Sequence, residues 1–326
     1  MKALLIAATS LATPLCGSNL VTVAHGQTYP AKPVRLIVPF TPGGGTDIAA
    51  RIIAPKLSER LSQPVLVDNR PGAAGAIGAD HTVKSAPDGY TLLVGSTSEI
   101  GIGPSLYSKL PYDVLRDLVA AAPFAATPMV LVVTPSLPVS TAADLVQLAR
   151  ARPGEINFGS AGAGTGNHMW SVMFGHLTKT RIVHVPYKGA APAQTDVMSG
   201  QVQMMFSTLP AATPFVKAGR LKALAVSSAQ RAPSMPQIPT MAQSGVAGFE
   251  AVYWYGFFAP AATPKDILAR IHADSAAVLR LPEIANSLSL QGLQSLDLTQ
   301  EAFANFVRIE MDKWAAVVKA SAARVD

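Results

Sequence analysis

The chain has little charge, few aromatic side chains and a single cysteine. Charged residues make up 14 % of its 326 residues, against about 25 % in an average domain, and this low share argues against a disordered chain. The lysines and arginines give a formal net charge of +6, but they are scattered and form no basic run. We therefore expect no nucleic-acid partner. Apolar residues reach 49 %, which is enough for a sizeable core.

The single cysteine, Cys16, lies in an N-terminal segment that is typical of a secretory signal. Lys2 supplies a positive charge, and a mostly apolar run follows from Ala3 to Leu15. The small residues of Ala24-His25-Gly26 fit a cleavage site. We therefore predict that residues 1–26 form a signal peptide that is removed on export.

Removal of this segment would leave a mature chain without a thiol. Such a chain has no disulfide, no thiolate metal site and no cysteine nucleophile. Lipid attachment at Cys16 is the alternative, and Leu15 disfavours it because a small residue is usual before a lipidated cysteine. The later histidines show no metal-binding spacing, so we expect neither a metal nor another cofactor. No later stretch could span a bilayer, and we expect a soluble exported protein.

Strand-like and helix-like segments alternate along the chain. Short, continuous apolar runs of this kind are typical of buried parallel strands, and their alternation with helices predicts an α/β fold. A chain of 326 residues exceeds one average domain, so two lobes are expected. The predicted strands are Val34–Pro39, Val65–Asp68, Thr91–Gly95, Met129–Val133, Ile156–Phe158, Ile182–Val185, Val202–Phe206 and Leu221–Val226.

Helical patterns lie between these strands and after the last of them. A four-residue apolar spacing predicts a helix over Ile53–Leu61 that Pro64 ends. A second helix is expected over Ser140–Arg150. Towards the C-terminus, Pro264 is a favourable first residue for a helix, and an amphipathic helix is expected after Thr299.

The first predicted strand runs into a glycine-rich loop, Thr41–Asp47, and a helix is expected to start there. Three consecutive glycines let the backbone turn tightly with its N–H groups exposed. The helix adds the positive end of its dipole at the same place. The loop therefore predicts an anion-binding site, with the Thr41 and Thr46 hydroxyls beside it.

Two nucleotide-binding interpretations of this loop fail on its residues. A dinucleotide fingerprint would need a further glycine at Ile48, and a nucleotide P-loop would need Gly-Lys-Ser/Thr. The acidic Asp47 stands where an anion would bind. It either caps the helix or holds an amino or hydroxyl group of the ligand.

A similar loop, Gly159–His168, follows the predicted strand Ile156–Phe158 and precedes an apolar helix. Its glycines and small hydroxyls again meet a helix start, which predicts a second anion-binding loop. A serine hydrolase is the alternative, with Ser160 as nucleophile and His168 as base. The nucleophile elbow needs Gly-x-Ser-x-Gly, but Phe158 stands at the leading glycine, so this alternative is disfavoured.

Further polar residues follow other predicted strands. Thr97, Ser98 and Glu99 come after Thr91–Gly95, at the carboxyl end where parallel sheets bind ligands. An ordinary polar loop is the alternative. Ser207 follows another predicted strand in the same way.

Several motifs together resemble one family along the whole mature chain. The chain is similar to the Bug family, the periplasmic solute receptors of tripartite tricarboxylate transporters. The matching stretches are Tyr29-Pro30, Lys32-Pro33-Val34, Pro39–Asp47, Asn69–Gly75, Pro87-Asp88-Gly89-Tyr90, Leu110-Pro111-Tyr112-Asp113, His184-Val185-Pro186-Tyr187-Lys188-Gly189, Pro192-Ala193, Asp196, Gly200-Gln201-Val202, Phe206, Pro239-Thr240, Ala259-Pro260 and Thr263-Pro264.

The resemblance implies a periplasmic binding protein-like fold of the Venus-flytrap type, with two α/β lobes joined by two crossing segments. It places lobe 1 at residues 27–126 plus 252–326 and lobe 2 at residues 127–251. It also implies a ligand that is a small carboxylate or a related solute, and it makes the two glycine-rich loops the ligand-contacting ones. A periplasmic location and transient contact with membrane transporter subunits follow from the same resemblance.

The chain departs from the family pattern next to Glu99. Family members have a His-Ala-x-Asn-Pro run where this chain has Ile100-Gly101-Ile102-Gly103-Pro104, so a polar Asn is lost at Gly103. If Glu99 faces the cleft, we expect it to repel a second carboxylate and to favour an amine or a neutral polar end of the ligand. Trp254, near the second crossing segment, either packs in the core or lines the cleft.

These observations together predict a monomeric solute-binding receptor that closes two lobes on a carboxylate and performs no covalent chemistry. The alternatives are an exported ligand-sensing protein for a signalling partner and the Ser160–His168 hydrolase. The predicted ligand-binding residues are Thr41, Gly44, Gly45, Thr46, Asp47, Thr97, Ser98, Glu99, Ser160, Ala161, Gly162, Gly164, Thr165, His168 and Ser207.

Overall fold

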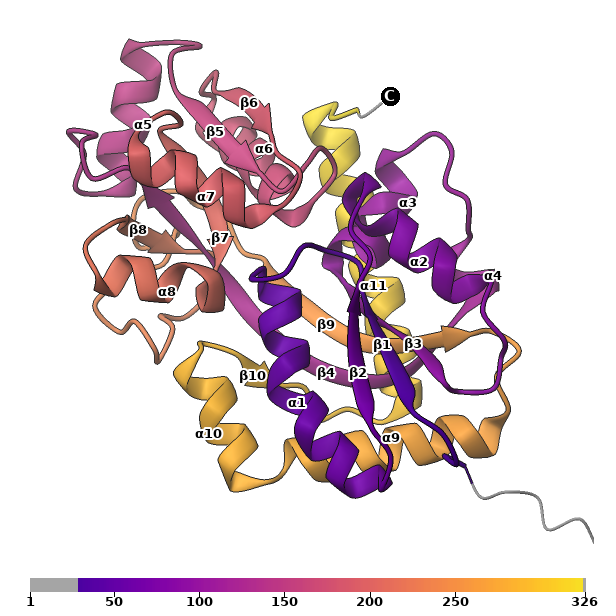
Figure 1. The fold of residues 1–326 in the computed structure, drawn as a ribbon. Helices are drawn as coiled ribbons and strands as arrows, with labels where there is room; N and C mark the ends of the chain where they lie inside the picture. Colours follow the sequence, from indigo (N-terminus) through magenta and orange to yellow (C-terminus); the bar gives the residue numbers. More distant parts are fainter. Residues whose placement is uncertain (1–28, 325–326) are drawn as a thin grey trace, which may run out of the picture.

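The structure is a computed structural model that describes residues 29–324. The predicted signal peptide, residues 1–26, and Cys16 lie outside the described residues. The elements gather in two groups, and the long strand β4 (Leu118–Val133) runs from one group into the other (Figure 1). We call the strands of these groups the first and the second half-sheet.

The first half-sheet combines parallel and antiparallel strands. Its order is β2 (Val65–Asn69), β1 (Val34–Val38), β3 (Thr91–Ser96), β9 (Val252–Pro260) and the first part of β4. β1 pairs in parallel with β2 and β3, whereas β9 runs antiparallel to both β3 and β4. The short β10 (Gln294–Ser295) also pairs with β4.

The second half-sheet begins on the last residues of β4. Met129–Val133 pair antiparallel with β7 (Met204–Thr208) and with β8 (Lys222–Val226). β5 (Asn157–Ser160) lies parallel to β7 and to β6 (Val183–Pro186). A single strand therefore belongs to both half-sheets, and it ties them together mechanically.

Helices cover both half-sheets. α1 packs on β2 and α9, while α9 and α11 pack on β4; α6 and α7 pack on β5 and β7 of the second half-sheet. Among the helices of residues 29–324, none has both the length and the apolarity that a membrane crossing needs. The helices and helical turns are α1 (Gly45–Leu61), η1 (Ala73–Gly75), α2 (Ala76–Val83), η2 (Thr97–Ile102), α3 (Gly103–Leu106), α4 (Val114–Asp117), α5 (Ala142–Ala151), α6 (Gly166–Thr178), α7 (Ala190–Ser199), α8 (Leu209–Lys217), α9 (Lys265–Leu279), α10 (Pro282–Leu290) and α11 (Gln300–Ser321).

All eight predicted strands are present, but the sheet is mixed and not purely parallel. The predicted strand Met129–Val133 is the end of β4, whose first part has no counterpart among the predictions. That part is rich in alanine and contains Pro123 and Pro128, which are residues that strands disfavour. The pairing of β4 with β9 shifts register on both sides of Ala122 and Pro123, so the strand bends around these residues.

The predicted helices are confirmed with small shifts at their ends. α1 ends at Leu61, the predicted last residue, because Ser62 adopts a left-handed conformation with a φ of 51°. The helix therefore ends before Pro64, the residue expected to stop it. α9 starts at Lys265, so Pro264 precedes the helix and is not its first residue. α11 starts after Thr299 as expected, and the Thr299 hydroxyl caps the helix by accepting a hydrogen bond from the amide of Ala302.

Ser227 links the two chain segments that pass between the half-sheets. Its amide donates to the Met129 carbonyl at 2.8 Å, and its hydroxyl accepts from the Met129 amide at 2.9 Å. The same hydroxyl donates to the Ala251 carbonyl at 2.6 Å, and the Ala251 amide donates to the Ser227 carbonyl at 3.0 Å. One fully buried side chain therefore holds β4 beside the segment that returns to β9.

Replacing Ser227 with alanine should lower the free energy of unfolding by about 2–4 kcal/mol. The substitution orphans the Met129 amide and weakens the bonding of the Ala251 carbonyl, and each buried unsatisfied group costs about 1–3 kcal/mol. Urea denaturation measures the change. Ser228→Ala is the matched control, because the Ser228 hydroxyl donates only to the Gln230 carbonyl in an exposed turn; equal losses in both variants would contradict a special role for Ser227.

Candidate functional site

Two helix starts point into the space between the half-sheets. The residues before them, Gly44 at α1 and Thr165 at α6, are extended, and neither supplies a side chain that caps the helix. The first amides of α1 therefore lack a side-chain acceptor at the N-cap, whereas the Gly166 amide of α6 already donates to the Ser98 hydroxyl at 3.0 Å. Each helix presents the positive end of its dipole. Both starts follow the carboxyl ends of parallel strands, β1 and β5, where open α/β sheets bind ligands.

A small inner cavity of about 30 Å³ lies between these helix starts. Its lining comes from both half-sheets, so neither could form it alone. This volume accepts little more than a carboxylate group. The residues that line the inner cavity are Phe40, Thr41, Gly44, Gly45, Thr46, Ser98, Ala161, Thr165, Asn167, Ala190, Ser207, Thr208 and Tyr253.

Three buried hydroxyls in this region have no hydrogen-bond partner among residues 29–324. They belong to Thr41, Thr208 and Tyr255. Thr41 and Thr208 line the inner cavity, and the Tyr255 hydroxyl lies only 2.7 Å from where a Cβ on Gly45 would stand. A buried polar group without a partner costs about 1–3 kcal/mol. The site therefore presents donors that lack an acceptor, which is the arrangement that a carboxylate would satisfy.

A larger outer chamber of about 500 Å³ adjoins the inner cavity and shares Phe40, Thr41 and Ala161 with it. Its wall is mostly apolar and includes the rings of Tyr107 and Tyr187, with Lys188 as its one charged residue. The remaining lining residues are Pro71, Gly72, Ala73, Ala74, Gly75, Gly162, Ala163 and Gly189. An elongated ligand could thus place a charged head inside and an apolar body outside.

Direct contacts across the cleft show that the site is closed. The Tyr107 hydroxyl donates to the Ala163 carbonyl at 2.8 Å, and the Gly166 amide donates to the Ser98 hydroxyl at 3.0 Å. Thr41 lies against Gly189, leaving no room for a side chain there. These contacts join loops of the first half-sheet to loops of the second.

The structure brings most of the predicted binding residues to one place. Those that line the inner cavity are Thr41, Gly44, Gly45, Thr46, Ser98, Ala161, Thr165 and Ser207, and Gly162 lines the outer chamber. The other predicted residues lie behind this lining; they are Asp47, Thr97, Glu99, Ser160, Gly164 and His168.

Asp47 holds the first loop and does not line the cavity. Its carboxylate accepts from the Gly43 amide at 2.9 Å, from Arg51 at 2.9 Å and from Asn69 at 3.0 Å. Burial alone would raise the pKa of Asp47, but the hydrogen bonds from Arg51, Gly43 and Asn69 outweigh it and hold the pKa below its usual value. Of the two interpretations of Asp47, these contacts support the structural one.

Thr97 and Trp254 also have packing roles. The Thr97 hydroxyl accepts from the Trp254 amide at 2.9 Å. The indole of Trp254 is fully buried, packs edge-on against Phe303 and Phe306, and donates to Glu310 at 3.1 Å. Trp254 is therefore part of the core behind the site.

The arrangement around Ser160 differs from a hydrolase site. Ser160 lies 2.6 Å from Nε2 of His184, not beside His168. His168 stacks on His184 with 4.1 Å between ring centroids, and its Nδ1 accepts from the Gly164 amide at 3.2 Å. Burial lowers the pKa of His168 to about 3 and that of His184 to about 4. None of the hydrogen bonds within residues 29–324 joins either ring to a carboxylate, so a charge-supporting third member is missing there.

Several lining residues have no counterpart among the predicted binding residues. Thr208 directly follows the predicted Ser207, and Tyr253 lies on β9, which is not among the predicted strands. Tyr187 and Lys188 stand in the motif that carries the family resemblance. That motif was the available signal for them. Phe40 likewise stands in the matching stretch Pro39–Asp47 and Asn167 in the predicted loop Gly159–His168, while Tyr107 and Ala190 lie in no such stretch.

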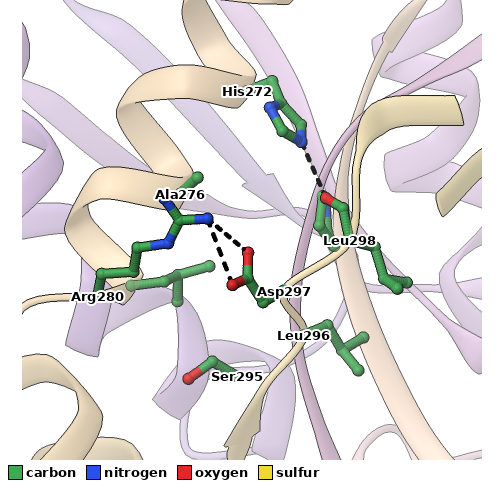
Figure 2. A pocket seen from close by; sticks show the side chains of 9 residues that line it. His272, Ala276, Arg280, Ser295, Leu296, Asp297 and Leu298 are labelled. Carbon is green, nitrogen blue, oxygen red and sulfur yellow. Dashed lines mark hydrogen bonds and ion pairs between the residues drawn. The ribbon is translucent and has the colours of Figure 1, made fainter. Parts of the chain in front are cut away.

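Another pocket, of about 180 Å³, lies away from this cleft and is less suited to an anion. It lies between α9 and the segment before α11 (Figure 2). Its arginine, Arg280, is already bonded to both carboxylate oxygens of Asp297, at 2.9 and 3.3 Å, and His272 pairs with the Leu298 carbonyl at 3.0 Å. Within residues 29–324 no group of His, Cys, Asp or Glu side chains is arranged to hold a metal ion.

Two half-sheets that share the strand β4 and hold a polar cavity between opposed helix starts define a two-lobe solute-binding protein. The chain belongs to the TctC family, described as the tripartite tricarboxylate transporter family receptor, whose model matches residues 49–322. Protein BugT of Bordetella pertussis is 37 % identical over 309 residues, covering 94 % of this chain and 95 % of BugT.

Solved structures of relatives agree with this assignment. Rpa4515 of R. palustris, in a structure with adipate, is 35 % identical with a TM-score of 0.89, covering 91 % of this chain and 100 % of that one. MatC of Rhodopseudomonas palustris, with bound malate, is 29 % identical with a TM-score of 0.85, covering 89 % of this chain and 100 % of MatC. The periplasmic binding-protein fold expected from the sequence is thereby confirmed.

The stacked histidines should make the fold sensitive to acid. Because the folded-state pKa values of His168 and His184 are depressed, the unfolded chain binds more protons below its histidine pKa of about 6.5. Stability is therefore present above pH 6.5 and is lost as the pH falls towards 4, by up to about 1.4 kcal/mol per pH unit for each ring.

His168→Asn should flatten this loss, since its amide oxygen can still accept from the Gly164 amide but cannot titrate. Denaturant unfolding between pH 4 and 7 measures the slope. His176→Asn is the control, because His176 is exposed on the same helix. An unchanged slope in His168→Asn would show that other groups cause the acid sensitivity.

Proposed function

We propose that this protein is a periplasmic receptor that captures a small carboxylate in the inner cavity and delivers it to a membrane transporter of the tripartite tricarboxylate type. One observation carries the proposal: two helix starts without side-chain caps and the unpartnered hydroxyls of Thr41 and Thr208 meet at one small cavity, and the unpartnered Tyr255 hydroxyl lies next to its Gly45 wall. All of these groups can donate hydrogen bonds. A carboxylate, which only accepts them, is the complementary ligand.

The magnitude of the interaction supports reversible capture. A hydrogen bond to a charged group contributes about 1.5–3 kcal/mol. Four or five such bonds, less the cost of ordering ligand and protein, correspond to an affinity of micromolar order. Such an affinity suits a receptor that must release its ligand, and binding needs no covalent step; we therefore propose a receptor and not an enzyme.

The two spaces suggest the shape of the ligand. A carboxylate head enters the inner cavity, and an apolar body lies in the outer chamber against Phe40, Tyr107 and Tyr187. Lys188 could meet a second anionic group at the far end. The adipate and malate in the structures of relatives support a carboxylate for this chain as well.

Closure of two lobes provides the mechanism of capture. We propose that residues 27–126 plus 252–326 form one lobe, that residues 127–251 form the other, and that the segments joined by Ser227 form the hinge. Ligand binds the closed form better, because only closure brings donors from both lobes to one carboxylate, and binding shifts the population to that form. The protein acts as a monomer that contacts transporter subunits transiently, and it needs no cofactor.

Removing the unpartnered hydroxyls should weaken binding without weakening the fold. A thermal-shift screen with mono- and dicarboxylates, aromatic acids and amino acids should identify carboxylate ligands, since binding to the native state stabilises it. Thr41→Val and Thr208→Val should each then lower the affinity about 10-fold or more, as about 1.5–3 kcal/mol is lost with each charge-assisted bond. Isothermal titration calorimetry measures the affinity.

The stability of both valine variants without ligand should equal or exceed that of the wild type, because the deleted hydroxyls have no hydrogen-bond partner within residues 29–324. Thr82→Val is the control: its hydroxyl is buried but bonds the Gly78 carbonyl inside α2, so it should leave the affinity unchanged. Stabilisation by amino acids or neutral solutes with none by any carboxylate would contradict the proposed function.

Two adjacent glycines of the first loop allow a steric test of closure. A Cβ on Gly45 would collide with the Thr208 hydroxyl and stand 2.7 Å from the Tyr255 hydroxyl, whereas on Gly44 the nearest atom is the Thr41 carbonyl oxygen at 3.5 Å. Gly45→Ala should therefore keep the cleft from closing fully and lower carboxylate affinity at least about 10-fold. Gly44→Ala, whose Cβ meets no atom of the second half-sheet within 4 Å, should lower the affinity less than Gly45→Ala does, and small-angle scattering with ligand should show closure only for Gly44→Ala. Equal affinities in the two variants would argue against closure at this contact.

A further inference from the structure

A chain of hydrogen bonds connects the buried carboxyl of Glu99 with the inner cavity. The Ser96 hydroxyl lies 2.7 Å from Oε2 of Glu99 and 2.8 Å from the Tyr253 hydroxyl. The Tyr253 hydroxyl lies 2.8 Å from that of Ser98, which accepts from the Gly166 amide at 3.0 Å. Tyr253 and Ser98 both line the inner cavity. Glu99 itself is about 1 % exposed and does not line it.

No positive charge compensates Glu99. None of the ion pairs within residues 29–324 includes it; the Ser96 amide donates to Oε1 at 2.5 Å, and the wall on its other side is Gly75, in η1. Burial raises its pKa to about 8, against the opposing effect of the hydrogen bonds from Ser96. Glu99 therefore changes protonation state near neutral pH.

Several other titratable groups lie around Glu99. Tyr253 on β9 and Tyr112, whose hydroxyl donates to the Glu99 carbonyl at 2.9 Å, have pKa values raised by burial. On α11, which packs on η2, Glu310 pairs with Trp254 and with Lys313. On α2, Asp80 pairs with Lys84. None of these charged side chains bonds the Glu99 carboxyl.

The protonation state of Glu99 sets the direction of every hydrogen bond between Glu99 and Ser98, because each hydroxyl has one proton to donate. An ionised Glu99 can only accept, so the Ser96 hydroxyl donates its hydrogen bond to Glu99. Tyr253 must then donate to Ser96, and Ser98 must donate to Tyr253. Ser98 then has no proton left for the cavity. A ligand beside it finds only a lone pair, which suits an N–H donor and opposes a carboxylate.

A protonated Glu99 reverses every bond in the chain. The acid donates to Ser96, Ser96 to Tyr253 and Tyr253 to Ser98. The proton of the Ser98 hydroxyl is then free to point into the inner cavity, beside the donors of the two helix starts. A carboxylate finds one more donor, and no negative charge remains behind the cavity wall.

We propose that Glu99 is a specificity-determining residue: through Ser96, Tyr253 and Ser98 it makes the binding of a carboxylate proceed with uptake of one proton, while its ionised form selects against carboxylates. The proton bonds to Oε2 of Glu99 and comes from the solvent. The coupling rests on the proposed function, since it concerns a carboxylate in the same cavity. Glu99 stands directly before the stretch Ile100–Pro104, where the protein departs from the family pattern.

The pH dependence of carboxylate binding tests this coupling. With malate, adipate and benzoate as probes, the wild-type affinity should fall about 10-fold between pH 7 and pH 9. Calorimetry at pH 9 in buffers of different ionisation enthalpy should show uptake of close to one proton per bound ligand. Glu99→Gln should bind the probes with less than threefold change over this range and take up no proton, because an amide can accept from the Ser96 amide and donate to the Ser96 hydroxyl as the protonated acid does.

A second variant separates the effect of the hydrogen bonds between Glu99 and Ser98 from the effect of the charge on Glu99. Tyr253→Phe keeps Glu99 and Ser96 but interrupts the chain before Ser98, so the pH dependence should shrink as it does in Glu99→Gln. Glu310→Gln is the control, because Glu310 is a buried acid outside the chain; it should keep the wild-type pH dependence.

The outcomes separate the two proposals. Probe binding by the wild type with the same pH dependence in Glu99→Gln, or with none in the wild type, overturns the coupling and leaves the proposed function standing. Failure of every carboxylate probe to bind the wild type at pH 6, where Glu99 is protonated, overturns the proposed function and the coupling with it.

Discussion

An excess of hydrogen-bond donors over acceptors at one buried place is the constraint on which the site depends. The starts of α1 and α6 lack side-chain caps, and the hydroxyls of Thr41, Thr208 and Tyr255 lack partners among the described residues. Each such group costs free energy when it is buried without a partner. Closing the cleft with no acceptor inside it therefore costs free energy. A carboxylate would remove that cost, and the proposed function therefore makes ligand capture and closure one event.

The topology of the sheets makes this coupling possible. β4 belongs to both half-sheets, and Ser227 joins it to the returning segment, so these are the connections about which the proposed lobes would move. The loops after β1 and β5 meet over the cavity, one from each half. A site divided in this way would be incomplete if the halves separated, and the proposed release of a solute would then need no element to unfold.

Local sequence patterns predicted the parts of this structure that are set by residues close together in the sequence. Apolar runs located the strands, and the glycine-rich loops located both helix starts, because a tight turn with exposed amides needs such residues. Pairing partners depend on distant segments, so the antiparallel β9 and the alanine-rich start of β4 could not be predicted from the same patterns. The cavity wall shows the same limit: Tyr253 reaches it only because β9 lies between β3 and β4. Asp47 and Ser160 stand in the predicted loops, but their side chains turn towards Arg51 and His184.

Glu99 shows how burial can reverse the meaning of a residue type. In the sequence, an acid next to an anion site indicates repulsion of a carboxylate, and that inference assumes an ionised group facing the cleft. The structure places the carboxyl behind Ser96 and Gly75 without a counter-charge, where the cost of desolvation favours the neutral acid. A neutral acid is a donor, and the three hydroxyls between it and the cavity pass that property on to the ligand. The same side chain thus opposes a carboxylate when ionised and assists it when protonated, so the surroundings of Glu99 decide which ligand it favours.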